Sequence, residues 1–209
     1  MQNRWMIGVL VLAGCGPLAH NGRTDSGLPL ATPPSAVGAV TEPTATPHDA
    51  TARAGAAELR NALGECQPLA GVAPFRTDKD QPASIHLCKT DGAIWWTSDL
   101  DIDCDGRDVA ECRSDPDRQL DTALHDSHGQ PLDPAQLPFV VIPGVSSNFD
   151  FRNAGLHLGS VVAVLFKDKV EYGIIGDIGP KAIIGEASFA MAQRLGLDPD
   201  PRHGGADSA

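Results

Sequence analysis

The pattern of apolar and polar positions predicts a domain built mainly from short strands. The clearest part is residues 161–178, where the runs VVAVLF and VEYGIIGDI flank the polar triplet KDK. Two apolar runs around a tight polar turn are typical of a β-hairpin. Residues 93–102 partly alternate apolar and polar side chains, and residues 139–142 form a brief apolar run before Pro143. Both segments are therefore predicted strands.

Two segments have the composition of helices. Residues 51–63 (TARAGAAELRNAL) contain good helix formers and are followed by Gly64, which favours a helix end there. After Gly185, the run EASFAMAQRLG has helical spacing and ends in Gly196. Long helices do not alternate with strands, so the fold class is predicted as mainly β (α+β), a small six-stranded barrel with one or two helices.

The amino terminus has the layout of an export signal. Arg4 supplies a positive charge, and the apolar run that follows it is too short to span a bilayer. The run ends in LAGC, which resembles the lipobox of bacterial lipoproteins and predicts a lipidated Cys15 at the end of a signal peptide, residues 1–15. The protein is then expected on a bacterial membrane, either the outer membrane or the cell surface. The lipid would be its only attachment to that membrane. A plain signal peptide with an incidental cysteine is the alternative.

The remaining chain is predicted to form one domain with flexible ends. Residues 16–52 are rich in Pro, Thr and Ala without any aromatic residue, so they are interpreted as a tether. Residues 198–209 are expected to be a disordered tail. The folded unit is predicted at residues 53–197, a common size for a single domain, and a monomer is expected.

Cysteine usage agrees with an exported protein. Four cysteines remain beside Cys15, namely Cys66, Cys88, Cys104 and Cys112. An even number in a small exported domain predicts two disulfides, and of the three pairings the local one is favoured, Cys66 with Cys88 and Cys104 with Cys112. A zinc site is the weaker alternative, because the sequence contains no CxxC pair.

The formal net charge of −11 limits the classes of partner. Binding to nucleic acid requires basic stripes, and none is visible, so no nucleic-acid partner is expected. A cationic ligand is compatible with this charge. Simple solubility explains the charge equally well.

Two carboxylate residues lie close together in the sequence, at and just after the carboxyl end of the predicted hairpin. Asp177 lies between glycines at the end of an apolar strand, and Glu186 is expected to open a helix nine positions later. Hydrolysis of a glycosidic bond needs such a pair, one carboxyl protonated and one ionised. The alternative interpretations are structural: Glu186 interacts with the helix dipole, and Asp177 bonds to its own turn.

A second acidic block is DIDCDG, which begins at Asp101 and contains Asp103 and Asp105. Residues two apart in a strand share a face, so these carboxylates are candidates for one lining. The block also matches the start of a calcium loop up to Gly106, but Cys112 stands where that loop needs a glutamate. Neither a metal nor a cofactor is expected.

Four blocks together resemble the fungal-type chitosanases of glycoside hydrolase family 75: DIDCDG, LPFVVIP, AGLHLGSVVAVLFKDKVEYGIIGDIGP and IIGEASFAMAQRLG. The similarity runs from about Trp95 to Leu197. It implies an endo-acting enzyme that hydrolyses β-1,4 links between glucosamine units with inversion. By motif match the essential pair falls on Asp177 and Glu186, with Glu186 assigned as general acid and Asp177 as base. Inversion requires the two carboxyl groups roughly 6.5–9.5 Å apart.

The implied substrate, chitosan, fits the acidic balance because each deacetylated sugar carries an ammonium group. Asp101, Asp103 and Asp105 are the candidate lining of the groove, and Trp96 is the candidate for stacking on a sugar ring, with Trp95 in the core. Two alternatives stay open, a peptidoglycan-processing lipoprotein and a non-catalytic glycan-binding lipoprotein. The segment GDIGP…GEAS also resembles six-stranded double-psi barrels, a likeness of fold and not of function.

Overall fold

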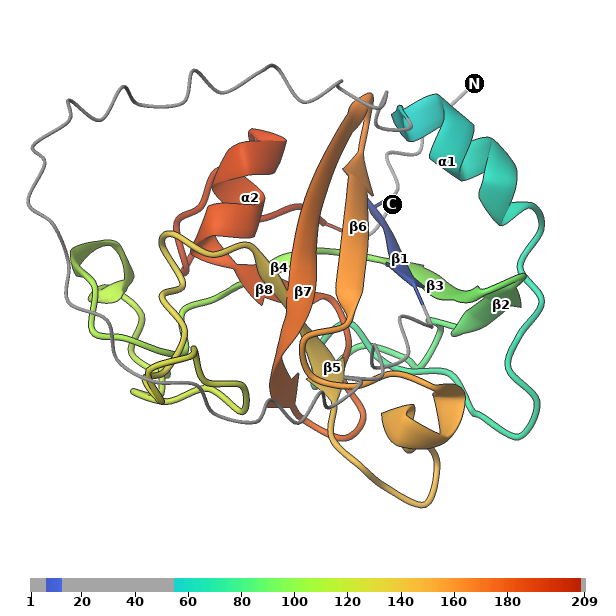
Figure 1. Ribbon diagram of the computed structural model, residues 1–209, viewed down its shortest axis with the longest axis horizontal. Helices are drawn as coiled ribbons and strands as arrows, with labels where there is room; N and C mark the ends of the chain where they lie inside the picture. Colours follow the sequence, from blue (N-terminus) through green and yellow to red (C-terminus); the bar gives the residue numbers. More distant parts are fainter. Residues whose placement is uncertain (1–6, 13–54, 208–209) are drawn as a thin grey trace, which may run out of the picture. The chain divides into compact units, whose positions relative to one another are not determined.

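The computed structural model describes residues 7–12 and 55–207. These residues form a mainly β domain with two α-helices, which confirms the predicted fold class (Figure 1). In chain order the elements are β1 (Ile7–Leu12), α1 (Ala56–Leu63), β2 (Cys88–Thr90), β3 (Ala93–Ser98), β4 (Asp101–Asp103), β5 (Phe139–Pro143), β6 (Val161–Phe166), β7 (Lys169–Gly179), β8 (Glu186–Ser188) and α2 (Phe189–Leu195), with 3-10 turns at Ala110–Cys112 and Phe151–Ala154. None of the helices in this part of the chain is long and apolar enough to cross a bilayer.

The strands form one sheet of eight, where the barrel prediction had six. Their order is β2-β3-β1-β6-β7-β5-β8-β4. The first five strands pair antiparallel, whereas β5 runs parallel to β7 and β4 runs parallel to β8. A single antiparallel pair, Val140 with Ala187, joins β5 to β8. The sheet therefore consists of an antiparallel half and a half that contains both parallel pairs.

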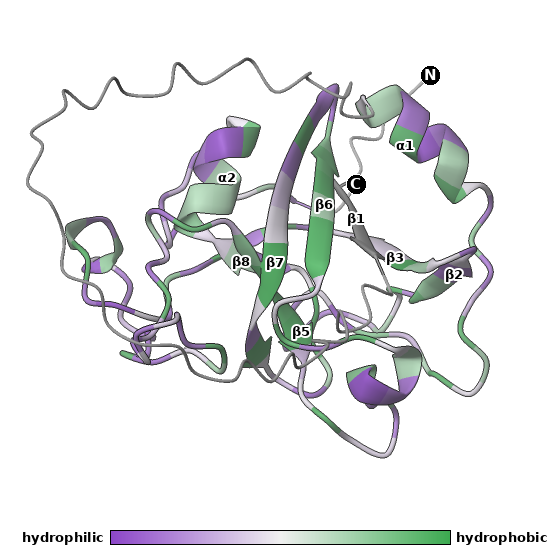
Figure 2. Ribbon diagram, viewed as in Figure 1, coloured by the Kyte–Doolittle hydropathy of each residue, from purple (hydrophilic) through white to green (hydrophobic). Residues whose placement is uncertain are grey.

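The predicted hairpin is β6 and β7. Its ladder runs from Val161 opposite Ile174 to Phe166 opposite Lys169, and Lys167 in the turn has a positive φ of 55°. Strand β6 is hydrophobic and buried along almost its whole length, whereas the first half of β7 is more polar (Figure 2). The hairpin thus anchors β7 in the core and carries its carboxyl end toward the other half of the sheet.

The second helix begins later than predicted. Glu186 lies in the short strand β8 and not in a helix, because residues 186–188 pair with β4. The helix starts after Ser188, whose hydroxyl accepts a hydrogen bond from the backbone N–H of Met191. Such an N-cap satisfies a backbone donor at the helix start. Gly196 ends the helix in the left-handed conformation, as predicted.

Both ends of the described chain form backbone pairs with other segments. Residues 7–12, inside the segment interpreted as an export signal, form β1 between β3 and β6. Residues 198–207, expected to be a disordered tail, are ordered, because Ala206 exchanges backbone hydrogen bonds of 2.9 and 3.0 Å with Leu100. The predicted tether, residues 16–52, and Cys15 lie outside the described residues.

Both predicted disulfides are present, Cys66 with Cys88 and Cys104 with Cys112. The first ties the chain before β2 to the antiparallel half of the sheet. The second closes a loop of the chain directly after β4. The local pairing is therefore confirmed for both pairs.

Candidate active site

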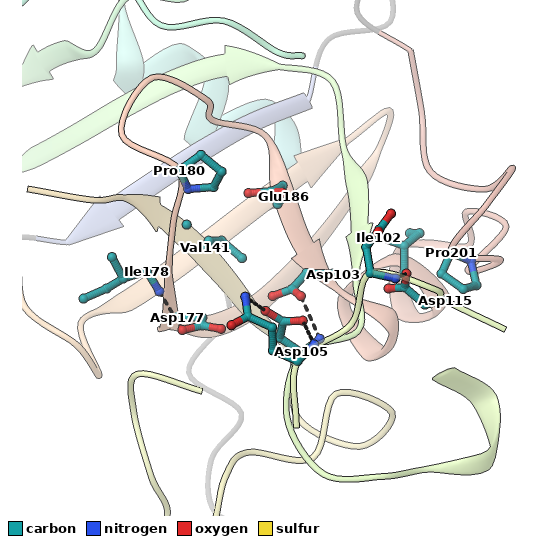
Figure 3. Close-up of a pocket in the computed structure, with 13 residues that line it drawn as sticks. Ile102, Asp103, Asp105, Asp115, Val141, Asp177, Ile178, Pro180, Glu186 and Pro201 are labelled. Atoms are coloured by element: carbon teal, nitrogen blue, oxygen red, sulfur yellow. Dashed lines mark hydrogen bonds between the residues drawn. The ribbon is translucent and has the colours of Figure 1, made fainter. Parts of the chain in front are cut away.

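A cavity of about 540 Å³ lies where the carboxyl end of β7 meets β4 and β8 (Figure 3). Among the described residues, those that line it include six with carboxylate side chains and no lysine, arginine or histidine. Its lining residues are Ile102, Asp103, Asp105, Asp115, Asp117, Gln119, Val141, Asp177, Ile178, Gly179, Pro180, Glu186 and Pro201. The cavity therefore attracts cations and repels anions.

Asp177 is held in the cavity wall by two backbone donors. It lies near the end of β7, paired with Val141 of β5, and is buried. Its Oδ1 accepts hydrogen bonds of 2.7 Å from the N–H of Ala123 and from the N–H of Ile178. Burial raises the pKa of this carboxyl, and the two hydrogen bonds act in the opposite direction. The donors fix the carboxylate and favour its ionised form.

Glu186 reaches the cavity from another strand and is also buried. It is the first residue of β8, paired with Asp101 of β4, and its Oε2 lies close above Gly179, where an added Cβ would stand only 2.9 Å away. Burial raises the pKa of Glu186 to about 7, with further contributions from the charges of Asp101, Asp105 and Asp177. This carboxyl therefore holds its proton to a higher pH than an ordinary glutamate.

The two carboxyls are held by different strand pairs. β7 runs parallel to β5, and β8 runs parallel to β4, so the end of one strand and the start of the other meet at one cavity. Gly179 allows this approach because its position has no side chain between Val141 and Glu186. The structure thus brings together Asp177 and Glu186, which the sequence identified as a pair.

Asp103 and Asp105 line the same cavity, as the sequence predicted (Figure 3). Asp103 Oδ1 accepts a 2.8 Å bond from the N–H of Asp105, and Asp103 Oδ2 is buried without a hydrogen-bond partner. Asp105 accepts bonds from Gln119, one from its backbone N–H at 2.5 Å and one from its side-chain amide at 3.2 Å. Burial raises the pKa of both aspartates, well above the ordinary value for Asp103.

Two other candidates are not in this cavity. Asp101 lines a separate cavity, together with Asp99 and Asp78. Trp96 was expected to be exposed, and this was wrong: it is 1% exposed in the main core. Trp95 packs in a second apolar cluster, so strand β3 is covered on both faces. Because β3 lies between two apolar layers, neither of its adjacent tryptophans is exposed. Trp96 therefore cannot stack on a sugar.

Several lining residues were missed by sequence reasoning. Asp115 and Asp117 come from the loop after the Cys104–Cys112 disulfide, and Pro201 comes from the carboxyl-terminal segment. A bond of 2.6 Å from Arg202 Nε to the carbonyl of Ser114 joins these two segments. No local pattern marks these residues, because long-range contacts alone place them at the site.

A metal site receives no support from the part of the chain that the structure describes. Within residues 55–207, no group of three or more His, Cys, Asp or Glu side chains is arranged to hold a metal ion. One oxygen of Asp103 and one of Asp105 accept bonds from backbone N–H groups instead. The arrangement can bind a cationic ligand and supply one protonated and one ionised carboxyl.

Comparisons of the sequence with known proteins find relatives that are named as endo-chitosanases. The relatives include an endo-chitosanase of Aspergillus oryzae, 34% identical over 128 residues, which are 56% of this chain and 51% of the relative. An endo-chitosanase B of the same species is 35% identical over 121 residues, which are 53% and 50%. An endo-chitosanase of Aspergillus fumigatus is 31% identical over 143 residues, which are 62% and 60%. The chain thus spans about half the length of most of these curated relatives.

The relatives also correct the expected location. They are enzymes of Aspergillus, a fungal source, and they overturn the prediction of a lipid anchor on a bacterial membrane at Cys15. The family model for the fungal chitosanases of glycosyl hydrolase group 75 matches residues 100–207, which include the entire cavity lining. This chain belongs to that family of glycosyl hydrolases.

Proposed function

We propose that this chain is an endo-chitosanase that hydrolyses β-1,4 links between glucosamine units with inversion at the anomeric carbon. The observation that carries the proposal is the unequal pair in one acidic cavity. Asp177 is fixed by two backbone N–H donors, while burial and neighbouring charges raise the pKa of Glu186 to about 7. Pairs of carboxyls whose surroundings separate their pKa values in this way divide the acid and base roles.

The reaction assigns one role to each carboxyl. Glu186 donates its proton to the glycosidic oxygen as the bond from that oxygen to the anomeric carbon breaks. Asp177 takes a proton from a water molecule, whose oxygen attacks the anomeric carbon from the opposite face. Glu186 then leaves the step ionised and Asp177 protonated, and exchange with solvent restores both.

The remaining acidic groups suit the substrate. Chitosan carries an ammonium on each deacetylated sugar, and the cavity has no cationic side chain to compete for Asp105, Asp115 and Asp117. Carboxylates in a cleft attract a polycation from a distance and pair with it on contact. The curated relatives are named as endo-chitosanases, which supports the same substrate for this chain.

The test is release of reducing ends from well-deacetylated chitosan by the full chain, with proton NMR of the first anomer formed. We expect cleavage of chitosan and initial release of the α-anomer, because inversion converts a β link. Glu186→Gln should abolish release, whereas Glu65→Gln, a matched change at an exposed position, should not. Initial release of the β-anomer would exclude inversion. A folded chain that leaves chitosan intact would overturn the proposal, and purified murein run in parallel would test the peptidoglycan alternative.

A further inference from the structure

An irregular segment, residues 119–124, contacts the end of β7 and helps to hold the carboxylate of Asp177. The N–H of Leu124 donates a 3.1 Å bond to the carbonyl of Gly176 in β7, and the N–H of Ala123 donates its 2.7 Å bond to Asp177 Oδ1. One of the two donors that fix this carboxylate therefore comes from a segment outside the strands.

The two donors to Asp177 differ in what supports them. Ile178 is the next residue of β7, so the backbone of that strand fixes its N–H (Figure 3). Ala123 lies 54 residues earlier in the chain, and its N–H belongs to the peptide unit that joins Thr122 to Ala123. Because a peptide unit is planar, the conformation of Thr122 sets the direction in which this N–H points. A change at Thr122 is therefore expected to weaken the bond from Ala123 and to leave the bond from Ile178 intact.

Thr122 is fixed by its own hydroxyl group. The residue is 5% exposed, and its Oγ1 donates a 2.7 Å bond to the carbonyl of Leu124 and accepts a 2.9 Å bond from the N–H of Leu132. The first bond closes the turn that contains Ala123, and the second fastens this turn to Leu132, which is itself buried. A hydroxyl can donate and accept at once, so one side chain satisfies two backbone groups. Valine at this position would satisfy neither.

We propose that Thr122 is a positioning residue of the hydrolytic reaction: its hydroxyl holds the N–H of Ala123 against Asp177 Oδ1 and so keeps Asp177 ionised and oriented toward the attacking water. Thr122 does not occur among the described residues that line the cavity, and it acts through Ala123. The inference rests on the proposed function for the role of Asp177 as base. The effect of Thr122 on the carboxylate itself can be measured without any substrate.

Other charged groups near Asp177 act in the opposite direction from the expected change. They are Asp121 with its ion-pair partner His125 from the same part of the chain, Asp103 and Asp105 from β4 and the residues after it, and Glu186 from β8. Movement of any of these carboxylates away from Asp177 would lower its pKa, because a nearby negative charge raises it. Loss of the Ala123 donor raises the pKa of Asp177, since a hydrogen bond to the ionised form favours that form. A rise therefore identifies loss of the donor.

The test is titration of the Asp177 carboxyl by carbon NMR in the full chain with selectively labelled aspartate, and Asp177→Asn assigns the signal. Glu186→Gln is present throughout, so that the two carboxyls do not titrate together. In Thr122→Val, which keeps the shape of the side chain, we expect the midpoint to rise by about half a pH unit or more. A hydrogen bond to a charged group is equivalent to about one unit of pKa, and the donor from Ile178 remains.

Three further variants isolate the hydroxyl group. Thr122→Ser keeps the hydroxyl and should keep the midpoint. Thr122→Ala removes the hydroxyl with less bulk and gives a second variant should Thr122→Val not fold. Ser160→Ala is the matched control, because it removes a buried hydroxyl that accepts a 3.0 Å bond from the N–H of His157, ahead of β6 and outside the cavity lining.

The pH profile of kcat/KM on chitosan, measured without Glu186→Gln, is the second readout. The base must be ionised, so the acid limb of the profile should move to higher pH in Thr122→Val by a similar amount. The alkaline limb, which belongs to Glu186, should stay in place. A merely structural loss would lower kcat/KM by the same factor at every pH.

The outcomes separate this inference from the proposed function. An unmoved midpoint in folded Thr122→Val or Thr122→Ala would overturn the inference, as would an equal rise in Thr122→Ser or Ser160→Ala. A rise of the midpoint in Thr122→Val, in a protein whose unaltered chain leaves chitosan intact, would refute the enzyme and leave the hold of Thr122 on Asp177 standing. Cleavage of chitosan with an unmoved midpoint would give the reverse.

Discussion

The two halves of the sheet are built from the same kinds of short strand, yet they serve different purposes. In the antiparallel half, β3 and β6 are buried between apolar layers and contribute no side chain to the candidate active site. In the half with the parallel pairs, β4, β7 and β8 contribute Asp103, Asp177 and Glu186 to one cavity. Strand β7 belongs to both halves, because Ile174 pairs with β6 and with β5.

The difference shows how the fold supports a cluster of like charges. A carboxylate cluster is self-repelling and costly to bury, so it needs a frame that is stable without it. The antiparallel half supplies this frame through the ladder of β6 and β7, which continues directly into the residues around Asp177. Substitutions in the antiparallel half are therefore expected to change the free energy of unfolding. Substitutions of the carboxylates in the other half are expected to change activity and its dependence on pH. The following changes test this division.

The largest effect is expected from removing the base. In Asp177→Asn the side chain keeps its shape and an acceptor oxygen for the N–H groups of Ala123 and Ile178, but it cannot take a proton from water. We expect kcat on chitosan to fall about 10²–10⁴-fold. The free energy of unfolding should not fall, because a buried charge is removed. Steady-state kinetics and urea unfolding measure both, with Asp168→Asn as control; unaltered kcat would show that Asp177 is not the base.

A change in the antiparallel half should have the opposite signature. Leu165 of β6 is fully buried, so Leu165→Ala removes apolar contacts and leaves a cavity. We expect a loss of about 2–5 kcal/mol in the free energy of unfolding. Well below the melting temperature kcat should be unchanged, because the parallel pairs that hold the carboxylates are intact. A large fall in kcat in a fully folded variant would contradict the division.

The halves also differ in how far their features could be predicted from the sequence. The hairpin of β6 and β7 could be predicted because its alternation and polar turn are local. The pairing of Asp177 with Glu186 could be predicted because a loop of a few residues joins them. Asp115, Asp117 and Pro201 could not, since contacts between distant segments place them in the cavity.

The errors have physical causes of the same kind. The prediction that Trp96 is exposed assumed a strand with one solvated face, but β3 has an apolar cluster on each face. The ordered residues after Leu197 contain little apolar surface, and their order comes from backbone pairing with Leu100. Three-residue strands such as β8 are stabilised by their neighbours and have no pattern long enough to distinguish them from a helix start.

The two disulfides allow a matched comparison between the halves. Replacing either cysteine pair by serine should lower the free energy of unfolding by about 2–4 kcal/mol under reversible conditions. Cys104 and Cys112 precede the loop that carries Asp115 and Asp117 and whose Gln119 holds Asp105. Their removal should therefore raise KM for chitosan several-fold, whereas removal of Cys66 and Cys88 should leave KM unchanged. Equal effects on KM would mean that the loop does not depend on its disulfide.

The pH dependence of the activity tests the roles assigned to the two carboxyls. Because Glu186 must be protonated to act as the acid and its pKa is about 7, kcat/KM should fall about tenfold per pH unit above that value. At the acid end it should fall as Asp177, whose pKa is raised by burial, becomes protonated. A profile that stays flat up to pH 9 would show that Glu186 is not the acid.

The same shift has a consequence for stability, with a definite sign. The pKa of Glu186 is higher in the folded protein, about 7, than its ordinary value of 4.5, so the folded state binds the proton more tightly. The resulting stabilisation is fully present below about pH 4.5 and is lost as pH rises to about 7. Glu186→Gln removes this contribution, so its free energy of unfolding should decrease less between pH 5 and pH 8 than that of the unaltered chain. Part of the decrease should remain, because burial also raises the pKa of Asp99 to about 7. Urea unfolding at the two pH values measures the difference. If the free energy of unfolding decreases equally in the variant and the unaltered chain, the carboxyls responsible for the decrease lie elsewhere in the molecule.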